Sequence, residues 1–250
     1  MQLGLTDKVF VVTAASSGLG LASARALVAE GARVCLVARR ETVLAEAVRE
    51  LGDGATSLAG DLSDPGLPKR AVDAALAAFG RVDGALVSVG GPPRGGVLDN
   101  TDDEWLAAFG SVFLPALRTA RAVVAANPAP ALGFVLSTSA KVPLATMAIS
   151  NGLRPGLAMV VKQLADEIGP AGGRAIGLMP GSILTERIRF LHSQSPDPAA
   201  SLAGAAAAVP LRRLGDPAEF GRVAAFVLSD AASYLTGCMI PVDGGALRAL

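Results

Sequence analysis

The sequence predicts a single α/β domain over residues 1–250, built on a doubly wound (Rossmann) parallel sheet of about seven strands with helices on both faces. Three observations predict it: short apolar runs recur along the chain, helical patterns fill most of the gaps, and no glycine-rich or charged linker divides the 250 residues. Apolar strands separated by helices are typical of a parallel sheet, which binds ligands at the carboxyl ends of its strands. The expected strands are residues 9–13, 33–38, 55–60, 83–89, 133–138, 174–179 and 237–242.

Two segments between the strands have patterns of their own. A capping-box sequence, Thr101 to Glu104, is expected to open a long helix in which Gly110 and Pro115 predict a bend or a break. Residues 187–210 carry two prolines and then an alanine-rich run. We therefore expect a mobile flap there, over the substrate, and not a core helix.

The composition argues against several functions. With 22 basic and 22 acidic residues, the chain has no net charge with which to attract nucleic acid or an anionic membrane. No uninterrupted apolar run approaches the roughly 18 residues that cross a bilayer, so we expect a cytoplasmic protein. Two cysteines and one histidine are too few for a metal cluster, and no metal site is expected.

A glycine-containing turn, residues 13–20 with the sequence TAASSGLG, joins the first strand to a helical segment. Glycines let a backbone approach a ligand closely, and the unpaired N–H groups of a helix N-terminus attract an anion such as a pyrophosphate. We interpret the turn as a dinucleotide-binding loop. Tight packing of the strand on the helix is the alternative explanation of Gly18 and Gly20.

The carboxyl-terminal third carries the most specific pattern. Residues 180–185 read PGSILT, residues 210–219 read PLRRLGDPAE, residues 229–237 read SDAASYLTG, and residues 242–245 read VDGG. With these motifs and the glycine turn, the chain resembles the short-chain dehydrogenase/reductase family over its full length, especially relatives of 3-oxoacyl-carrier-protein reductases. The resemblance implies an NAD(P)-dependent oxidoreductase that acts on a small alcohol or carbonyl substrate and assembles as a homotetramer or homodimer.

The resemblance also implies which residues bind the dinucleotide. Asp61 and Leu62 match the pair that contacts the adenine, and a carboxylate that caps the following helix is the alternative for Asp61. Ala14 stands where the family usually has its first glycine. The other implied contacts come from Thr13, Ser16, Ser17, Gly18, Leu19, Gly20, Gly90, Arg154, Pro180, Gly181 and Thr185, of which Thr185 would reach the nicotinamide carboxamide.

The end of the second strand predicts which dinucleotide is bound. A carboxylate there would accept a hydrogen bond from a ribose 2′-hydroxyl, whereas an arginine would pair with a 2′-phosphate. The chain has Ala38 followed by Arg39, so NADP(H) is expected over NAD(H). A solvated pair, Arg39 and Arg40, at the start of a helix is the alternative.

The family's catalytic pattern is a tyrosine, a lysine four residues later, and a serine. In the matching register this chain has Ser150 and Arg154, and its single tyrosine, Tyr234, lies in the carboxyl-terminal motif. For the serine, Ser137 is ranked slightly above Ser139. A serine hydroxyl is a poor general acid, since its pKa lies far above the value of about 10 for a phenol. An arginine can nevertheless stabilise negative charge on a carbonyl oxygen.

Other positions depart from the family pattern as well. Ser88 and Val112 fall where the family has asparagines. Pro155 lacks a backbone N–H and is expected to begin its helix. In that case Ser150 and Arg154 need not share a helix face.

Lys141 and His192 are the remaining titratable candidates near the site, and an ordinary solvated side chain is the alternative for each. The apolar flap residues Ile188, Phe190 and Leu191 are expected to cover the substrate. Two functions follow from the sequence. The chain is either an NADP(H)-preferring oxidoreductase with a rebuilt catalytic centre, or a dinucleotide-binding sensor or partner subunit with little or no catalysis.

Overall fold

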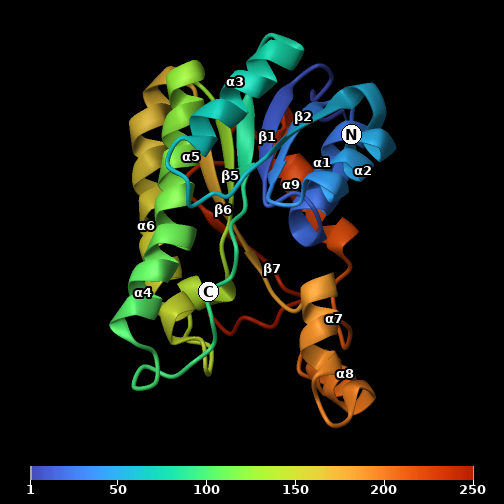
Figure 1. The fold of residues 1–250 in the computed structure, drawn as a ribbon, viewed down its shortest axis with the longest axis vertical. Coiled ribbons are helices and arrows are strands. Elements are labelled where there is room, and N and C mark those ends of the chain that lie inside the picture. The colour runs from blue at the N-terminus through green and yellow to red at the C-terminus, as the bar shows by residue number, and fades with distance from the viewer. Residues whose placement is uncertain (1, 250) are drawn as a thin grey trace.

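A computed structural model describes residues 2–249 as three layers, with one parallel sheet between two layers of helices (Figure 1). The seven strands lie in the order β3-β2-β1-β4-β5-β6-β7, so the chain runs outward from β1 and then returns to place β4 beside it. The predicted fold class is confirmed. The strands are β1 (Val9–Thr13), β2 (Arg33–Ala38), β3 (Ala55–Ala59), β4 (Gly84–Val87), β5 (Ala131–Val135), β6 (Arg174–Pro180) and β7 (Met239–Val242).

Helices cover both faces because successive strand residues point to opposite sides. In β1, Val9 and Val11 join one apolar core, whereas Phe10 and Val12 join the other. The first core lies under α3 (Leu67–Phe79), α4 (Asp102–Ala108), α5 (Leu114–Ala126) and α6 (Ala148–Ile168). The second lies under α1 (Gly18–Ala29), α2 (Glu41–Leu51) and α9 (Pro217–Leu228). Short 3₁₀ turns occupy Gly52–Gly54, Thr138–Ala140, Gly169–Ala171 and Asp230–Ala232.

The long helix that follows β4 contains the predicted irregularity. The capping box at Thr101 is formed, and a π-helical turn, Phe109–Phe113, separates α4 from α5 around Gly110. Residues 102–126 together are long and apolar enough to cross a membrane by length and composition alone. This helix instead packs its buried face on β4 and α3, as expected of a core helix.

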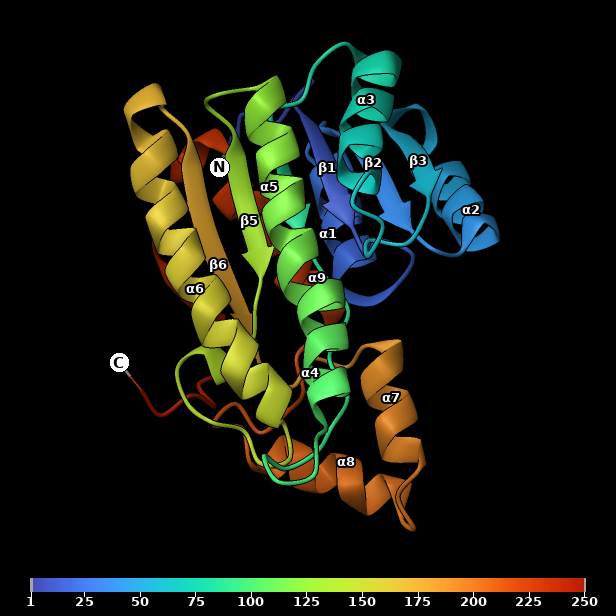
Figure 2. The same cartoon turned by 60° about the vertical axis from the view of Figure 1, so that its left-hand side comes forward.

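The segment expected to be a mobile flap contains two helices, α7 (Glu186–Ser193) and α8 (Pro198–Ala207). Neither has a buried residue, so neither is a core helix. The prolines do not prevent these helices, because Thr185 and Asp197 cap them and Pro198 is the first residue of α8. Figure 2 shows both helices beyond the end of the sheet toward which the strand arrowheads point.

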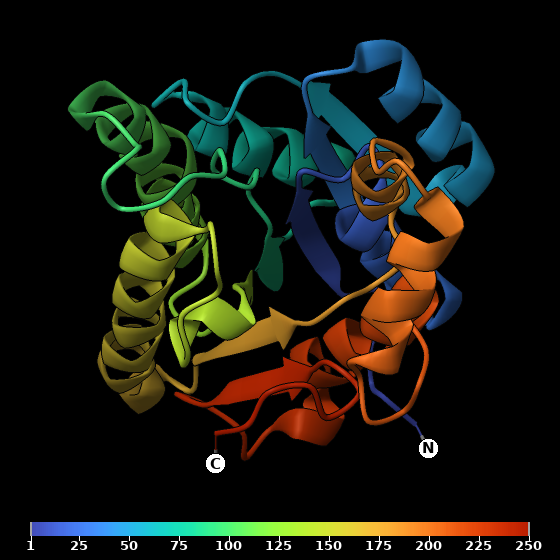
Figure 3. The same cartoon turned by 90° about the horizontal axis from the view of Figure 1, so that it is seen from below.

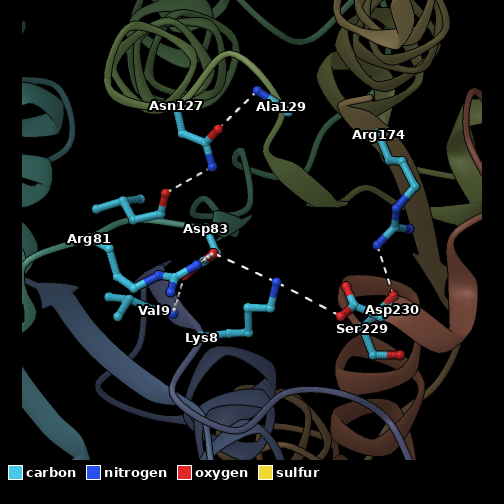
Figure 4. Close-up of polar contacts among 10 residues, drawn as sticks. Lys8, Val9, Arg81, Asp83, Asn127, Ala129, Arg174, Ser229 and Asp230 are labelled. Atoms are coloured by element: carbon cyan, nitrogen blue, oxygen red, sulfur yellow. Dashed lines mark hydrogen bonds and ion pairs between the residues drawn. The ribbon is translucent and has the colours of Figure 1, made fainter. Parts of the chain in front are cut away.

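Polar side chains close the opposite, amino-terminal end of the sheet (Figure 4). Asp83 accepts hydrogen bonds from the Val9 amide at 2.9 Å and from the Arg81 guanidinium at 2.6 and 2.8 Å. Lys8 lies 3.9 Å from Asp83 and 3.8 Å from Asp230, so it bridges the two carboxylates. These contacts join β1 to the segment before β4 and to the turn after α9.

A third cation at this end, Arg174, contacts the last turn of α9 and the residues after it. The Arg174 guanidinium donates to the carbonyl oxygens of Val227, Ser229 and Ala232 at 2.8, 2.9 and 3.0 Å. Carbonyl groups at a helix C-terminus lack partners within the helix, and a cation there also interacts favourably with the helix dipole. The charged groups named at the amino-terminal end therefore have partners within the fold.

Candidate active site

The candidate site lies at the carboxyl ends of the strands. In Figure 3 this edge is seen from below, with α7 and α8 on one side of it and the segment before α4 on the other. The base of the α7–α8 segment is fixed because Ile183 pairs with Gly215 in an isolated bridge. On the other side, Gly95 pairs with Met147, which ties the segment before α4 to the start of α6.

The glycine turn leaves the N-terminus of α1 ready for an anion. Ser17 is the N-cap residue, but its hydroxyl caps no backbone N–H, and the first turn has no acidic side chain. Gly18 has a φ of +57°, and a Cβ at Gly20 would lie 2.6 Å from the Ala14 carbonyl oxygen. The turn therefore needs glycine at both positions, and its exposed amides have the geometry that binds phosphate groups.

Ala14 departs from the expected glycine at a cost. Its φ is +50°, in the left-handed region that disfavours a residue with a Cβ. The methyl group is nevertheless accommodated, and the Ala15 amide still donates to the Val37 carbonyl at 3.1 Å. The alanine strains the turn without displacing it from β2.

Thr13 does not offer its side chain to a ligand. Its Oγ1 donates to the Ser88 carbonyl at 2.5 Å and accepts from the Ser88 amide at 2.8 Å, and the residue is buried. Both hydrogen bonds of the Thr13 hydroxyl join β1 to the residue after β4, so a contact of Thr13 with a dinucleotide, which stays a prediction, would come from its backbone. Ser88 takes part through its backbone.

Two arginines follow β2 at the surface. The Arg40 Nη2 donates to the Ser16 hydroxyl at 3.3 Å, so Arg40 extends toward the glycine turn. Arg39 lies near Asp61, whose pKa is lowered chiefly by the amide and hydroxyl of Ser63 and also by the charge of Arg39. An ionised Asp61 and both guanidiniums are therefore gathered beside the turn. Leu62 is half-buried next to them against the core.

The structure places Ser139, and not the higher-ranked Ser137, against Ser150. Ser139 Oγ lies 3.0 Å from Ser150 Oγ, and both residues are buried. Ser137 instead accepts a hydrogen bond from the Ser139 amide at 3.1 Å, which caps the 3₁₀ turn Thr138–Ala140. Ser139 is therefore the serine that faces Ser150, because this turn intervenes between β5 and the site.

The start of α6 is also corrected. The helix begins at Ala148, and Pro155 lies inside it, not at its first position. Ser150 and Arg154 are consequently one helical turn apart and both buried, so they share a face. Asn151 fixes the preceding loop, because its side-chain amide bonds to both the N–H and the carbonyl of Leu144 at 2.9 Å.

Arg154 is a buried cation without an acidic partner among residues 2–249. Its Nη1 donates to the Val135 carbonyl at 2.8 Å and its Nη2 to the Gly90 carbonyl at 3.4 Å, while its Nε has no hydrogen-bond partner. Burial, and secondarily the nearby charge of Arg187, lower the pKa of Arg154 to about 10. The guanidinium is still positively charged at neutral pH, and it is buried with one N–H unpaired.

The remaining expected residues differ in how closely they are packed. A Cβ at Gly90 would meet no atom within 4 Å, so this glycine borders room for a ligand. Pro180 ends β6, and Gly181 lies so close to Asp243 that a Cβ would be 2.6 Å from the aspartate Cβ. Thr185 caps α7 and lies against Gly18, with its Cγ2 3.5 Å from the position of a Cβ there.

The other titratable candidates are more exposed than this group. Tyr234 is fully exposed, and Lys141 is exposed in the loop before α6. His192 Nδ1 lies 2.7 Å from Ser201 Oγ, which joins α7 to α8. The sequence interpretation missed Arg187, whose guanidinium occupies the room that a side chain at Gly91 would fill. The glycine pair at the end of β4 was the available signal.

A cavity of about 930 Å³ reaches only the edge of this site. It touches Ser17, Gly18 and Thr185 and then extends along the outer groove between α1 and α9. The buried serines and Arg154 are not among its lining residues. We therefore define the candidate site by the glycine turn, Gly90 and the Ser139–Ser150–Arg154 group, and not by this cavity.

Comparison with known proteins identifies the class to which this fold and site belong. The family model described as enoyl-(acyl carrier protein) reductase matches residues 13–246. The 3-oxoacyl-[acyl-carrier-protein] reductase FabG of Salmonella typhimurium is 32% identical over 247 residues, which span 97% of this chain and 98% of that protein. The chain belongs to the short-chain dehydrogenase/reductase family of oxidoreductases, and the resemblance seen in the sequence is confirmed.

Solved structures agree with this assignment. L-sorbose reductase from Gluconobacter frateurii, complexed with NADPH and L-sorbose, has a TM-score of 0.94 at 30% identity, with 100% of each chain covered. The 3-ketoacyl-(acyl-carrier-protein) reductase from Brucella melitensis, complexed with NADH, has a TM-score of 0.87 at 27% identity, covering 97% of this chain and 99% of that one. Similar folds thus bind either nicotinamide dinucleotide.

Proposed function

We propose that this protein is an NADP(H)-preferring oxidoreductase that interconverts a small alcohol and carbonyl compound with an atypical set of residues. The single observation that carries the proposal is the buried group at the open space beside Gly90, in which Ser139 and Ser150 lie 3.0 Å apart and Arg154 one helical turn further along α6. The uncompensated charge of Arg154 and its unpaired Nε favour a functional role for this residue over a role in packing alone.

The residues present fit the nicotinamide dinucleotide. The uncapped amides at Ser17 to Gly20 would hold the pyrophosphate, and Arg39 with Arg40 would pair with a 2′-phosphate. Asp61 and Leu62 would border the adenine, and Arg154 would donate to the nicotinamide ribose. The bound dinucleotide supplies or accepts the hydride.

The chain's own contribution is hydrogen bonding and positive charge at the carbonyl oxygen. The hydroxyls of Ser139 and Ser150 would donate to that oxygen and orient the substrate. The first turn of α6, in which Ser150 lies, and the Arg154 guanidinium would stabilise the negative charge that develops there. Since Arg154 keeps its proton at neutral pH, we infer that solvent exchanges the substrate proton and that turnover is slow.

Fluorescence titrations with NADPH and NADH, followed by cofactor-oxidation assays with ketones, diketones and oxoacyl thioesters, test this function. We expect tighter binding of NADPH and measurable turnover with at least one carbonyl class. Absence of binding of both nucleotides would contradict the cofactor assignment and leave only the fold.

The lack of a tyrosine and lysine in the matching register favours a second function, a dinucleotide-binding sensor or partner subunit without catalysis. The double variant Ser150→Tyr with Arg154→Lys distinguishes the two. Turnover that appears only in this variant, while the unchanged protein binds NADPH and converts no substrate, would support the silent protein. Both functions agree with a cytoplasmic protein that binds small molecules.

We also propose that the protein is a homodimer or homotetramer. Leu106 on α4 and Met159 on α6 are 69% and 71% exposed, so this helical face presents large apolar side chains to solvent. Light scattering tests the assembly, and a monomeric mass at micromolar concentration would contradict it.

A further inference from the structure

Two guanidiniums meet at the end of β4. Arg154 reaches the Gly90 carbonyl with its Nη2, from the α6 side. Arg187, from the first turn of α7, lies against the next residue, Gly91, in the room that a Cβ would otherwise fill. Residues that are 33 positions apart in the sequence therefore place two positive charges at one glycine pair.

No acidic side chain neutralises this pair. Within residues 2–249, neither Arg154 nor Arg187 has a carboxylate oxygen within 4.0 Å. The neighbours of Arg187 on α7, Glu186 and Arg189, line the outer groove between α1 and α9 instead. Arg154 moreover is buried and has an Nε without a hydrogen-bond partner. Two like charges, one of them desolvated, are costly to hold together unless an anion binds between them.

We propose that Arg187, with the positive charge of Arg154 beside it, binds the carboxylate of an acidic substrate. A planar guanidinium matches the two oxygens of a carboxylate. A carboxylate would also offset the positive charge of the two guanidiniums, whereas a neutral sugar or ester would not. This inference rests on the proposed oxidoreductase function, since it names the class of substrate that the same site takes.

The pyrophosphate of the dinucleotide is the other possible source of the anion. The substrate is favoured because α1 already offers its uncapped N-terminus to the pyrophosphate, whereas Arg154 lies deeper, at the Val135 and Gly90 carbonyls beside the two serines. The two sources predict opposite effects of bound nucleotide on the binding of a small carboxylate.

Calorimetric titration at constant ionic strength tests the site, with malonate as the anionic probe and malonamide as its neutral counterpart. Each is titrated into the protein with and without saturating NADP⁺. We expect malonate to bind the NADP⁺-loaded protein, and malonamide to bind at least ten-fold more weakly. Arg187→Gln should weaken malonate binding at least ten-fold and Arg187→Lys less, while Arg189→Gln, the matched control on the same helix, should leave it unchanged.

Three results would overturn the proposal. In the first, Arg187→Gln leaves the affinity for malonate unchanged. In the second, malonate and malonamide bind with equal affinity. In the third, malonate binds only to the nucleotide-free protein and NADP⁺ displaces it. The last result would assign the two guanidiniums to the pyrophosphate. A parallel fluorescence titration measures NADPH binding by each variant. A variant that no longer binds NADPH is thereby distinguished from one that has lost only malonate binding.

Discussion

Ser139 and Ser150 lie with their hydroxyl oxygens 3.0 Å apart, although they belong to different elements and are separated by 11 positions in the chain. Ser139 lies in the 3₁₀ turn after β5, and Ser150 lies in the first turn of α6. The contact brings together two side chains that can each donate to the same acceptor, next to a buried positive charge.

This contact distinguishes Ser139 from Ser137 by experiment. Ser139→Ala should lower kcat about 10- to 100-fold, because it removes a donor to the developing negative charge. Ser137→Ala should leave kcat nearly unchanged and cost about 0.5–1 kcal/mol of unfolding free energy through the lost cap. Steady-state kinetics with matched thermal denaturation measures both, and an equal loss of kcat in the two variants would argue against the assignment.

The arginines after β2 should set the preference for the phosphorylated dinucleotide. Loss of a charge-assisted hydrogen bond costs about 1.5–3 kcal/mol, so Arg39→Ala should raise the Kd for NADPH about 10- to 100-fold and hardly alter that for NADH. Arg40→Ala should raise the Kd for NADPH by a smaller factor, because Arg40 already donates a hydrogen bond to Ser16. Arg49→Ala, in the last turn of the following helix α2, serves as the control in fluorescence titrations. Parallel weakening of both nucleotides would refute the role.

Burial of the charged Arg154 should lower the free energy of unfolding. A pKa lowered from 12.5 to about 10 corresponds to roughly 3 kcal/mol of unfavourable burial. Arg154→Met removes this cost but leaves the Val135 carbonyl without its donor, a loss of about 1–3 kcal/mol. We expect the variant to be more stable by about 1 kcal/mol in urea denaturation, with turnover abolished. A clearly destabilised variant would show that Arg154 is chiefly structural.

Replacing Ala14 by glycine should relieve the backbone strain of the turn. The left-handed conformation costs an L-residue about 1–2 kcal/mol, and glycine returns part of this gain through the entropy of the unfolded chain. Ala14→Gly is therefore expected to stabilise the protein by about 0–1 kcal/mol and to preserve NADPH binding. Gly20→Ala, whose methyl group would collide with the Ala14 carbonyl, should destabilise it and weaken binding. Thermal denaturation would contradict this if Ala14→Gly lowered the Tm.

Acid sensitivity should depend on Glu219. The Arg213 guanidinium, which donates to both carboxylate oxygens at 2.7 Å, and the Asp216 amide lower the pKa of Glu219 to about 2. Because the folded pKa lies below the unfolded value, this carboxylate contributes stability above pH 4.5 that is lost as the pH falls toward 2. Glu219→Gln should flatten the dependence of Tm on pH in that range. Glu46→Gln, at an exposed position on α2, is the control and should retain the wild-type slope.

The hydrophobic pattern was sufficient for the fold, because burial on both faces makes every strand of a parallel sheet apolar. The site was predicted less completely. The count back from Ser150 favoured Ser137, whereas the strand pattern of residues 133–136 favoured Ser139, which is the serine that lies against Ser150. Pro155 hid the true start of α6, as a single missing hydrogen bond is tolerated inside a helix that packs on the sheet.

Contacts between distant segments were beyond the reach of the sequence. Arg187 lies in a segment that was expected to be irregular, and nothing in its neighbourhood in the chain indicates that it meets Gly91. The bond between Thr13 and Ser88 likewise depends on which strands are neighbours, which only the topology decides.

The Thr13 hydroxyl also holds the two central strands of the sheet at a fixed spacing. It joins the two strands from which the chain departs toward opposite sides, one leading into the nucleotide half and the other into the reacting half. The spacing between the two halves of the sheet is therefore held by two buried residues, Thr13 and Ser88. Loops at the strand ends can change in sequence without altering this spacing.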